Sequence, residues 1–231
     1  MDLSVVVPCY NEEARLPASL ARLASFLEGH GGSFELILVD DGSADRTLEI
    51  IREAERRFPY VRALALPHRG KGAALAEGVR CSRGRLVLLS DADFSTPIEE
   101  LSRLEEAIAE GADVAIGSRA APGAREVDQP LHRRLMGKTF NLLVQALLLP
   151  GIWDTQCGFK LFRGPVARQL FAQLHTAGFA FDVEVLYRAR RSGHRVCEVP
   201  VRWINSPSSR VSPLRDARSM ALDLLRIRLR R

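Results

Sequence analysis

Short apolar runs alternate with amphipathic stretches through the first half of the chain. The apolar runs cover residues 3–8, 35–39, 61–66, 85–89 and 112–116, and their composition predicts strands buried on both faces. Between them apolar residues recur at helical spacing, as the leucines within residues 16–27 do. This alternation predicts an α/β fold with a mostly parallel sheet flanked by helices.

Two helix starts are indicated by local signals. A helix is expected over residues 44–57, directly after the polar segment that ends the second apolar run. Thr96, Pro97 and Glu99 match a capping box with proline at the first helical position, which predicts a helix beginning at Pro97.

The second half of the chain has a different pattern. Residues 121–130 are rich in proline, glycine and charge and are expected to form a loop. The sequence predicts helices over 133–149 and 179–191, a strand over 196–203, and a basic amphipathic helix over 213–231. We therefore expect one domain over residues 1–212, followed by a C-terminal amphipathic helix over 213–231.

Composition limits the cellular compartment in which the protein is expected and the kinds of partner that it can bind. The four cysteines of the 231 residues are scattered without metal-site spacing, which argues against a zinc site and favours a reducing environment. No secretory pattern is found, and the longest apolar run, residues 142–150, is too short to span a bilayer. We expect a cytoplasmic protein. The net charge of +5 favours a polyanionic partner such as a nucleotide, a nucleic acid or an anionic membrane.

Polar clusters follow four of the predicted strands. They are Tyr10-Asn11-Glu12, Asp40-Asp41, Asp91-Ala92-Asp93 and Arg119. Ligands of parallel sheets bind beyond the carboxyl ends of the strands, so these clusters are expected to converge at one edge. The two carboxylates of the third cluster suit Mg²⁺ or Mn²⁺; as an alternative, they only cap the next helix.

Two polar segments, one of which contains the Asp40-Asp41 cluster, allow more than one interpretation. Asp40-Asp41-Gly42-Ser43 suits a turn with a helix cap, and equally hydrogen bonding to a base or ribose. Arg69-Gly70-Lys71-Gly72 opens a helix with positive charge beside flexible glycine, which suits contact with a phosphate, although the spacing is not that of a Walker A loop.

The order of these motifs resembles glycosyltransferase family 2, the inverting enzymes with a GT-A fold. The resemblance rests on residues 6–13, 39–43, 70–72, 91–93 and 117–119. Residues 154–162, Asp-Thr-Gln-Cys-Gly-Phe-Lys-Leu-Phe, resemble the dolichyl- and polyprenyl-phosphate glucosyltransferase branch. The resemblance covers nearly the whole chain and implies a nucleotide-sugar half over 1–119 and an acceptor half over 120–212.

The resemblance also implies residue roles. Nucleotide contacts are expected from Pro8, Tyr10, Glu12, Asp40, Asp41, Lys71 and Ala92. Asp91 and Asp93 would bind the metal, with Ser95 as a third polar contact, and Arg119 would meet the donor diphosphate. Acceptor contacts are expected from Arg133, Arg134 and Lys160, and Arg210 would close a loop over the phosphates. Of these, Asp91, Asp93, Arg119, Arg133 and Arg210 are the expected catalytic residues. The sequence departs from the family pattern at Gly137, near the acceptor site, and at Pro207-Ser208, in the loop.

The implied reaction moves a hexose, glucose by this resemblance, from UDP-glucose to a polyprenyl phosphate with inversion. A phosphate acceptor is already anionic, so it needs cationic positioning rather than a base. One alternative is transfer to a soluble hydroxyl or glycan, with Asp182 or Glu184 as base. Another is a nucleotide-binding protein without catalysis, which the acidic strand ends argue against, because carboxylates repel phosphate unless a metal intervenes.

The basic helix over 213–231 has two interpretations. It is either a docking helix with a solvated arginine face or a helix that lies on an anionic membrane. In the second interpretation the protein is peripheral on the inner face of the membrane. Its expected partners are then a nucleotide-sugar and a lipid phosphate, and no nucleic acid. The oligomeric state is left open.

Overall fold

The computed structural model describes residues 1–128, 131–205 and 213–230, and the side chains of 131–136, 213–219 and 221 lie outside this description. Its strands are β1 (Leu3–Cys9), β2 (Phe34–Asp41), β3 (Val61–Leu66), β4 (Leu86–Leu89), β5 (Val114–Ser118), β6 (Arg125–Val127), β7 (Lys160–Arg163), β8 (Val196–Pro200) and β9 (Arg202–Ile204). Its helices are α1 (Leu16–His30), α2 (Thr47–Arg57), α3 (Lys71–Cys81), the 3₁₀ turn η1 (Ile98–Glu100), α4 (Leu101–Ala109), α5 (Leu131–Leu147), α6 (Gly164–Ala172), α7 (Phe181–Arg191) and α8 (Pro213–Leu229).

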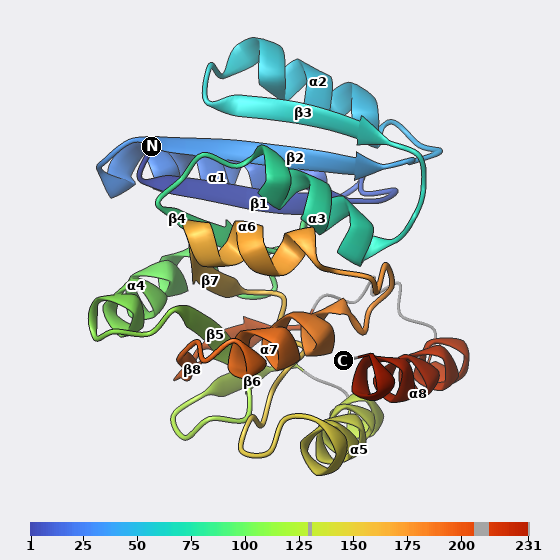
Figure 1. The fold of residues 1–231 in the computed structure, drawn as a ribbon. Helices are drawn as coiled ribbons and strands as arrows, with labels where there is room; N and C mark the ends of the chain where they lie inside the picture. Colours follow the sequence, from blue (N-terminus) through green and yellow to red (C-terminus); the bar gives the residue numbers. More distant parts are fainter. Residues whose placement is uncertain (129–130, 206–212, 231) are drawn as a thin grey trace.

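A seven-stranded sheet in the order β3-β2-β1-β4-β7-β5-β8 forms the centre of the molecule (Figure 1). Neighbouring strands are parallel except at β7, which is antiparallel to both β4 and β5. The short strands β6 and β9 pair in a second, two-stranded sheet. The predicted α/β architecture with a mostly parallel sheet is confirmed.

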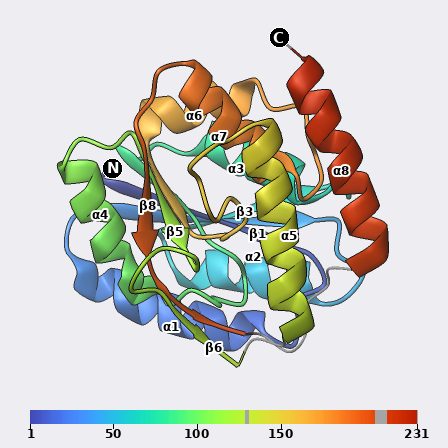
Figure 2. The same cartoon turned by 90° about the horizontal axis from the view of Figure 1, so that it is seen from below.

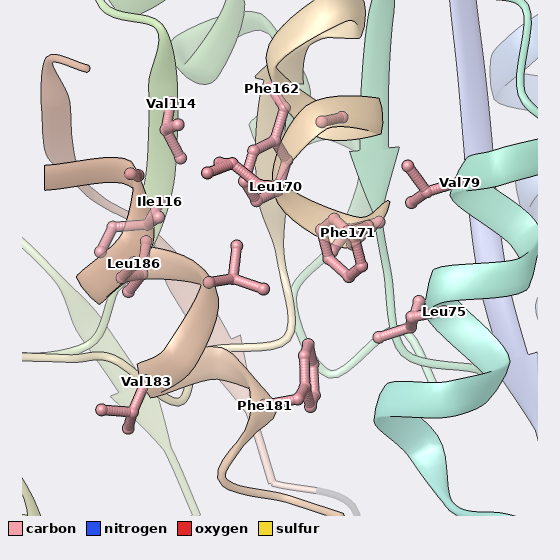
Figure 3. Packing of buried hydrophobic residues seen from close by; sticks show 14 of the residues in the cluster. Leu75, Val79, Val114, Ile116, Phe162, Leu170, Phe171, Phe181, Val183 and Leu186 are labelled. Carbon is pink, nitrogen blue, oxygen red and sulfur yellow. The ribbon is translucent and has the colours of Figure 1, made fainter. Parts of the chain in front are cut away.

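The sheet is covered on both faces, so successive strand residues point into two separate cores. Val5 and Val7 pack with α1, α2 and α4, whereas Val6 packs with α3, α6 and α7. Figure 3 shows the second of these clusters, in which Phe171 of α6 and Phe181 of α7 lie toward Leu75 of α3, and Phe162 of β7 lies beside Leu170 of α6. Burial on both faces explains why the strands read as continuous apolar runs.

The C-terminal helix is part of the domain's packing. Met220, Leu224 and Ile227 of α8 are buried in the same core as the α3, α6 and α7 side chains. In both ribbon views α8 runs beside α5, and in Figure 2 these two helices form the face nearest the reader. Among the described residues, no helix combines the length and apolar character needed to cross a membrane.

Several predicted boundaries are wrong. The capping box does not form: Pro97 is extended with ψ of 140°, the first turn is the 3₁₀ turn η1, and the Thr96 hydroxyl contacts the thiol of Cys157 at 3.6 Å instead. Helix α2 begins at Thr47 rather than residue 44, because Asp45 accepts the Thr47 N–H and holds the preceding residues in a turn.

The region after residue 119 contains structure that local patterns did not predict. Residues 125–127 form a strand rather than a loop, since their partners in β9 come from a distant part of the chain. Helix α6 was not predicted. The strand expected over 196–203 is divided at Val201, whose N–H donates to Ser118, so β8 joins the large sheet and β9 joins β6.

Candidate active site

The carboxyl ends of β1, β2, β4 and β5 meet at one edge of the sheet, and the predicted polar clusters lie there. The chain runs from β1 to β2 and β3 on one side and returns to β4 on the other, so β1 and β4 flank a switch point, where such sheets bind ligands. Since β7 is antiparallel, its first residue, Lys160, comes to the same edge, opposite Leu89 and Ile116.

Asp91, at the end of β4, is held from two sides. The Lys71 ammonium at the start of α3 lies 2.5 Å from its carboxylate. Gly158 approaches from the other side, where an added Cβ would lie 2.1 Å from an Asp91 carboxylate oxygen. Burial raises the pKa of Asp91, but the attraction of Lys71 outweighs it and the pKa stays below the usual range. Asp91 is therefore an ionised carboxylate in a defined position.

Asp93 belongs to a separate network of charged side chains. Arg15 at the start of α1 donates to both oxygens of Glu12, and its other terminal nitrogen lies 3.3 Å from Asp93. The N–H of Ser95 donates to the remaining oxygen of Asp93 at 3.0 Å. Glu12 thus holds an arginine against the acidic pair, and Ser95 orients Asp93 through its backbone.

Adjacent Asp40 and Asp41 have different surroundings. Asp41 accepts the N–H groups of Arg69 and Gly70 at 2.9 Å each, and His68 Nδ1 lies 2.9 Å from the same carboxylate. Asp40 accepts only the Ser43 N–H at 3.2 Å, and its buried Oδ1 has no hydrogen-bond partner within the described parts of the chain. Asp41 orders the loop before α3, whereas Asp40 has an acceptor oxygen that the described residues leave unpaired.

The other expected nucleotide residues divide between the site and the core. Tyr10 is on the surface, stacked on His68 with ring centroids 4.2 Å apart. Pro8 is half-buried within β1, paired with Val39 of β2. The Ala92 side chain is buried in the core on the α1, α2 and α4 face. Tyr10 therefore offers an accessible ring at the edge, and Ala92 contributes packing.

Lys160 and Asp182 form a buried ion pair beneath the site. The Lys160 ammonium lies 2.5 Å from Asp182 and also donates to the Cys157 carbonyl. Burial raises the pKa of Asp182 although Lys160 and Lys71 oppose the shift. With an exposed fraction of 1%, Lys160 does not face solvent in this structure, and the expected direct contact with an acceptor stays a prediction.

Glu184, the other acid weighed as a base, has a structural role. Its carboxylate accepts the N–H groups of His175 and Thr176 and pairs with Arg188 at 2.8 Å. These contacts fix the loop before α7. Neither Asp182 nor Glu184 presents an uncommitted carboxylate at the edge of the sheet.

Arg119 follows β5 and is oriented by Asp154. Its N–H, Nε and Nη2 donate to the Asp154 carboxylate at 2.7 to 2.9 Å, and its guanidinium lies 5.4 Å from the centre of the Trp203 ring. Burial lowers the pKa of Arg119, but Asp154 outweighs burial, so the guanidinium stays charged. Arg119 is a fixed cation one strand beyond β7.

Two carboxylates, Asp91 and Asp93, fit a divalent cation. Both are hard oxygen donors and both are partly exposed at the sheet edge. Within the described part of the chain, no three acidic, histidine or cysteine side chains gather as a full ligand set. Mg²⁺ is usually bound by one or two carboxylates, and phosphates of the substrate supply further ligands.

Three expected cations fall where side chains are not described. Arg133 and Arg134 belong to the first turn of α5, but their side chains lie outside the described residues, as does all of Arg210. Their expected roles stay predictions.

Four residues of the site were not predicted. Arg15, His68, Asp154 and Gly158 each act through a partner far along the chain. Arg15 left a local signal, because it follows Glu12 by the three residues that allow an ion pair on a helical turn. Asp154 and Gly158 fall within residues 154–162, which carry the family resemblance, but that segment does not reveal their contacts with Arg119 and Asp91.

Comparisons with known proteins agree with this geometry. The model of the family described as Glycosyl transferase family 2 matches residues 4–171. The dolichyl-phosphate beta-glucosyltransferase of Dictyostelium discoideum is 37% identical over 99% of this chain and 74% of its own length. The human protein of that name is 38% identical over 99% and 75%, and the Saccharomyces cerevisiae protein 36% over 98% and 74%.

Solved structures share the fold. Glucosyl-3-phosphoglycerate synthase from Mycobacterium tuberculosis, crystallised with Mn²⁺, UDP and phosphoglyceric acid, matches 98% of this chain and 76% of its own with a TM-score of 0.72 and 21% identity. Mannosyl-3-phosphoglycerate synthase from Rubrobacter xylanophilus matches with a TM-score of 0.72 and 19% identity over 98% and 72%. The predicted GT-A fold is confirmed, and the chain belongs to glycosyl transferase family 2.

Proposed function

We propose that this chain transfers glucose from UDP-glucose to a polyprenyl phosphate, with inversion at the sugar carbon. The main support is the arrangement at the ends of β1 and β4, where the partly exposed carboxylates of Asp91 and Asp93 contact Lys71 and Arg15. Acids and bases alternate there, which suits a diphosphate bound through a cation. The similarity to dolichyl-phosphate beta-glucosyltransferases supports the choice of sugar and acceptor.

The donor's nucleoside would lie at the ends of β1 and β2. The unpartnered Oδ1 of Asp40 suits the N–H of a uracil ring, and a buried acceptor left unpaired is costly without such a donor. The exposed Tyr10 ring, braced by His68, offers a surface for stacking. Asp41, whose oxygens are engaged by the loop, would support the site indirectly.

Asp91 and Asp93 would hold Mg²⁺ or Mn²⁺, with Ser95 nearby. The ion would neutralise charge on the departing diphosphate. Lys71 and Arg15, which now contact these two carboxylates, would then be within reach of the phosphates. Arg119, held by Asp154, would add a fixed positive charge on the same edge.

The acceptor is proposed to be a phosphate rather than a hydroxyl. Transfer to a hydroxyl needs a base, and the two acids weighed for that role are both committed, Asp182 to Lys160 and Glu184 to Arg188 and backbone N–H groups. A phosphate oxygen needs no proton removed. Arg133, Arg134 and Arg210 are proposed to receive it, in the half that follows residue 119.

Because a polyprenyl phosphate is a lipid, the reaction is proposed to take place at a membrane surface, with the protein peripheral on its cytoplasmic side. The donor half, residues 1–119, would bind a soluble nucleotide-sugar, while the acceptor half, residues 120–212, would meet the lipid headgroup.

The test is transfer of radiolabel from UDP-glucose into lipid. The protein is incubated with labelled UDP-glucose or GDP-mannose, Mn²⁺ and undecaprenyl phosphate, and lipid is extracted. We expect lipid-linked label from UDP-glucose, none with undecaprenol in place of its phosphate, and none with a chelator or with Asp93→Asn. Absence of label from every donor would contradict the proposal; hydrolysis of UDP-glucose alone would overturn the acceptor.

A further inference from the structure

Helix α8 has two apolar faces. Met220, Leu224 and Ile227 are buried against the domain, and Leu222, Leu225 and Leu229 are 48%, 52% and 80% exposed. At about 100° per residue the exposed leucines lie directly opposite the buried side chains. A surface helix that only docks needs one apolar face, so the second is unexplained by the packing of the domain.

Arginines flank the exposed leucines on both sides. At the same helical spacing Arg226 and Arg230 fall on one flank and Arg228 on the other, all exposed. Arg226 pairs with Asp223 at 2.9 Å, while Arg228 and Arg230 make no side-chain ion pair with the residues that the structure describes. A leucine stripe with arginines at its borders is the pattern of a helix lying in a membrane interface.

Helix α5 extends this surface. In α5, Leu142 and Leu143 are 66% and 40% exposed, whereas Val144 is buried. Figures 1 and 2 show α5 and α8 side by side on one face of the molecule. We call Leu142, Leu143, Leu222, Leu225 and Leu229 the α5–α8 face.

A basic cavity adjoins the arginine flank of α8. It measures about 280 Å³ and lies between α7 and α8, with Arg188, Arg191 and Arg230 in its wall. Its one acid, Glu184, is paired with Arg188. Arg230 also lines a second cavity of about 210 Å³, shared with Arg226 and with Asp223, the acid that pairs with Arg226. Both spaces suit a phosphate headgroup at the edge of the leucine stripe.

We propose that the α5–α8 face is the surface by which this protein lies on an anionic membrane, with its leucines in the headgroup–acyl boundary and Arg226, Arg228 and Arg230 on lipid phosphates. This proposal rests on the proposed function, because a lipid acceptor gives the protein a reason to bind a membrane. The observations that support it come from α5 and α8 and are independent of the active site. Charge favours a membrane over a second copy of the chain: the described part of α8 offers one acid, Asp223, already paired, to meet a partner's arginines.

The test is sedimentation of the full chain with vesicles of phosphatidylcholine, with and without phosphatidylglycerol. We expect binding that needs phosphatidylglycerol. The substitutions L222S, L225S and L229S together should weaken it at least about tenfold. R228Q with R230Q should weaken it about thirtyfold at low salt, by about 1 kcal/mol for each arginine. R52Q with R56Q on α2, the same charge loss on the far side of the molecule (Figure 1), is the matched control and should change little.

Three results would overturn the proposal. They are unchanged binding by the leucine variant, an equal effect of the α2 control, and a wild-type dimer in light scattering that the leucine variant dissociates without any vesicle binding. Transfer to a short-chain, water-soluble prenyl phosphate is measured in parallel and should be retained by both α8 variants. If the wild type transfers nothing there, the proposed function fails, while the vesicle result still decides the role of this face.

Discussion

Adjacent aspartates at the end of β2 differ in what their oxygens contact. Asp41 is saturated by two backbone N–H groups and His68, so its carboxylate holds the loop that leads into α3. Asp40 has a buried oxygen with no partner among the described residues. An acid that holds structure and an acid with an unpaired buried oxygen therefore stand side by side.

Asp40→Asn and Asp41→Asn should separate these roles. Asp40→Asn is expected to weaken UDP binding about tenfold, because a charged hydrogen bond is replaced by a neutral one, with stability changed by less than about 1 kcal/mol. Asp41→Asn should cost about 1–3 kcal/mol, since its NH₂ must face one of two N–H donors. Calorimetric titration with UDP and urea unfolding measure the two effects; equal losses of stability would contradict the assignment.

Gly158 controls Asp91 by having no side chain. In Gly158→Ala the new Cβ would overlap the Asp91 carboxylate and displace it, although the φ of Gly158 lies outside the left-handed region and itself suits alanine. We expect turnover to fall about a hundredfold, the usual effect of moving a catalytic group by about 1 Å. Gly29→Ala, in open space on α1, is the control and should keep full turnover. Wild-type turnover in Gly158→Ala would show that Asp91 is positioned otherwise.

At the scale of elements, α8 combines packing with a surface. Leu224→Ala should destabilise the protein by about 2–5 kcal/mol, because Leu224 is fully buried in the core. Leu225→Ala, one residue further and half exposed, should change stability by less than about 0.5 kcal/mol. Urea unfolding of both variants measures this. Similar losses of stability in the two variants would mean that α8 does not pack against the domain through the face that carries Leu224.

Strand β7 shows how a topology change builds the site. It enters the sheet antiparallel between β4 and β5, so the loop before it runs along the edge where the parallel strands end. That loop supplies Asp154 to Arg119 and Gly158 to Asp91. Residues after 119 thereby complete the edge that the first 119 residues begin.

At the scale of the whole molecule, buried acids are balanced by buried bases, and stability depends on pH accordingly. Burial raises the pKa of Asp154, but Arg119 outweighs it, so the folded-state pKa lies below the ordinary 3.8. The unfolded chain binds the proton more readily, so this contribution is present above pH 3.8 and is lost as the pH falls below it.

Asp154→Asn tests this linkage. Near neutral pH it should cost about 3–5 kcal/mol, since Arg119 is left buried without its partner. The stability difference from the wild type should shrink as the pH falls below 3.8, because the unfolded wild-type chain takes up the proton there and folded Asp154 takes it up only at still lower pH. Urea unfolding over a pH series measures it. A difference that stays constant with pH would contradict the pairing.

Sequence patterning by itself determined the succession of the first five strands along the chain and the fold class, and the motifs at the strand ends determined the family. Strand β3 was predicted with its observed ends, and Asp91, Asp93 and Arg119 were placed at strand ends, because burial on two faces leaves a continuous apolar run that stops where the strand reaches the ligand edge. Local signals failed at Thr96 and at β6, where the deciding partners, Cys157 and β9, are distant.

Only the tertiary structure decided which of these polar groups are available. Arg15 reaches Asp93 from 78 positions away, and Lys160 is buried on Asp182 rather than turned outward, because each contact depends on how separate elements pack. The same holds for Asp40 and Asp41, which are equivalent in sequence and differ only because the loop before α3 closes over one of them. Residue type and periodicity are local properties, whereas hydrogen-bond saturation and burial arise only when distant segments meet.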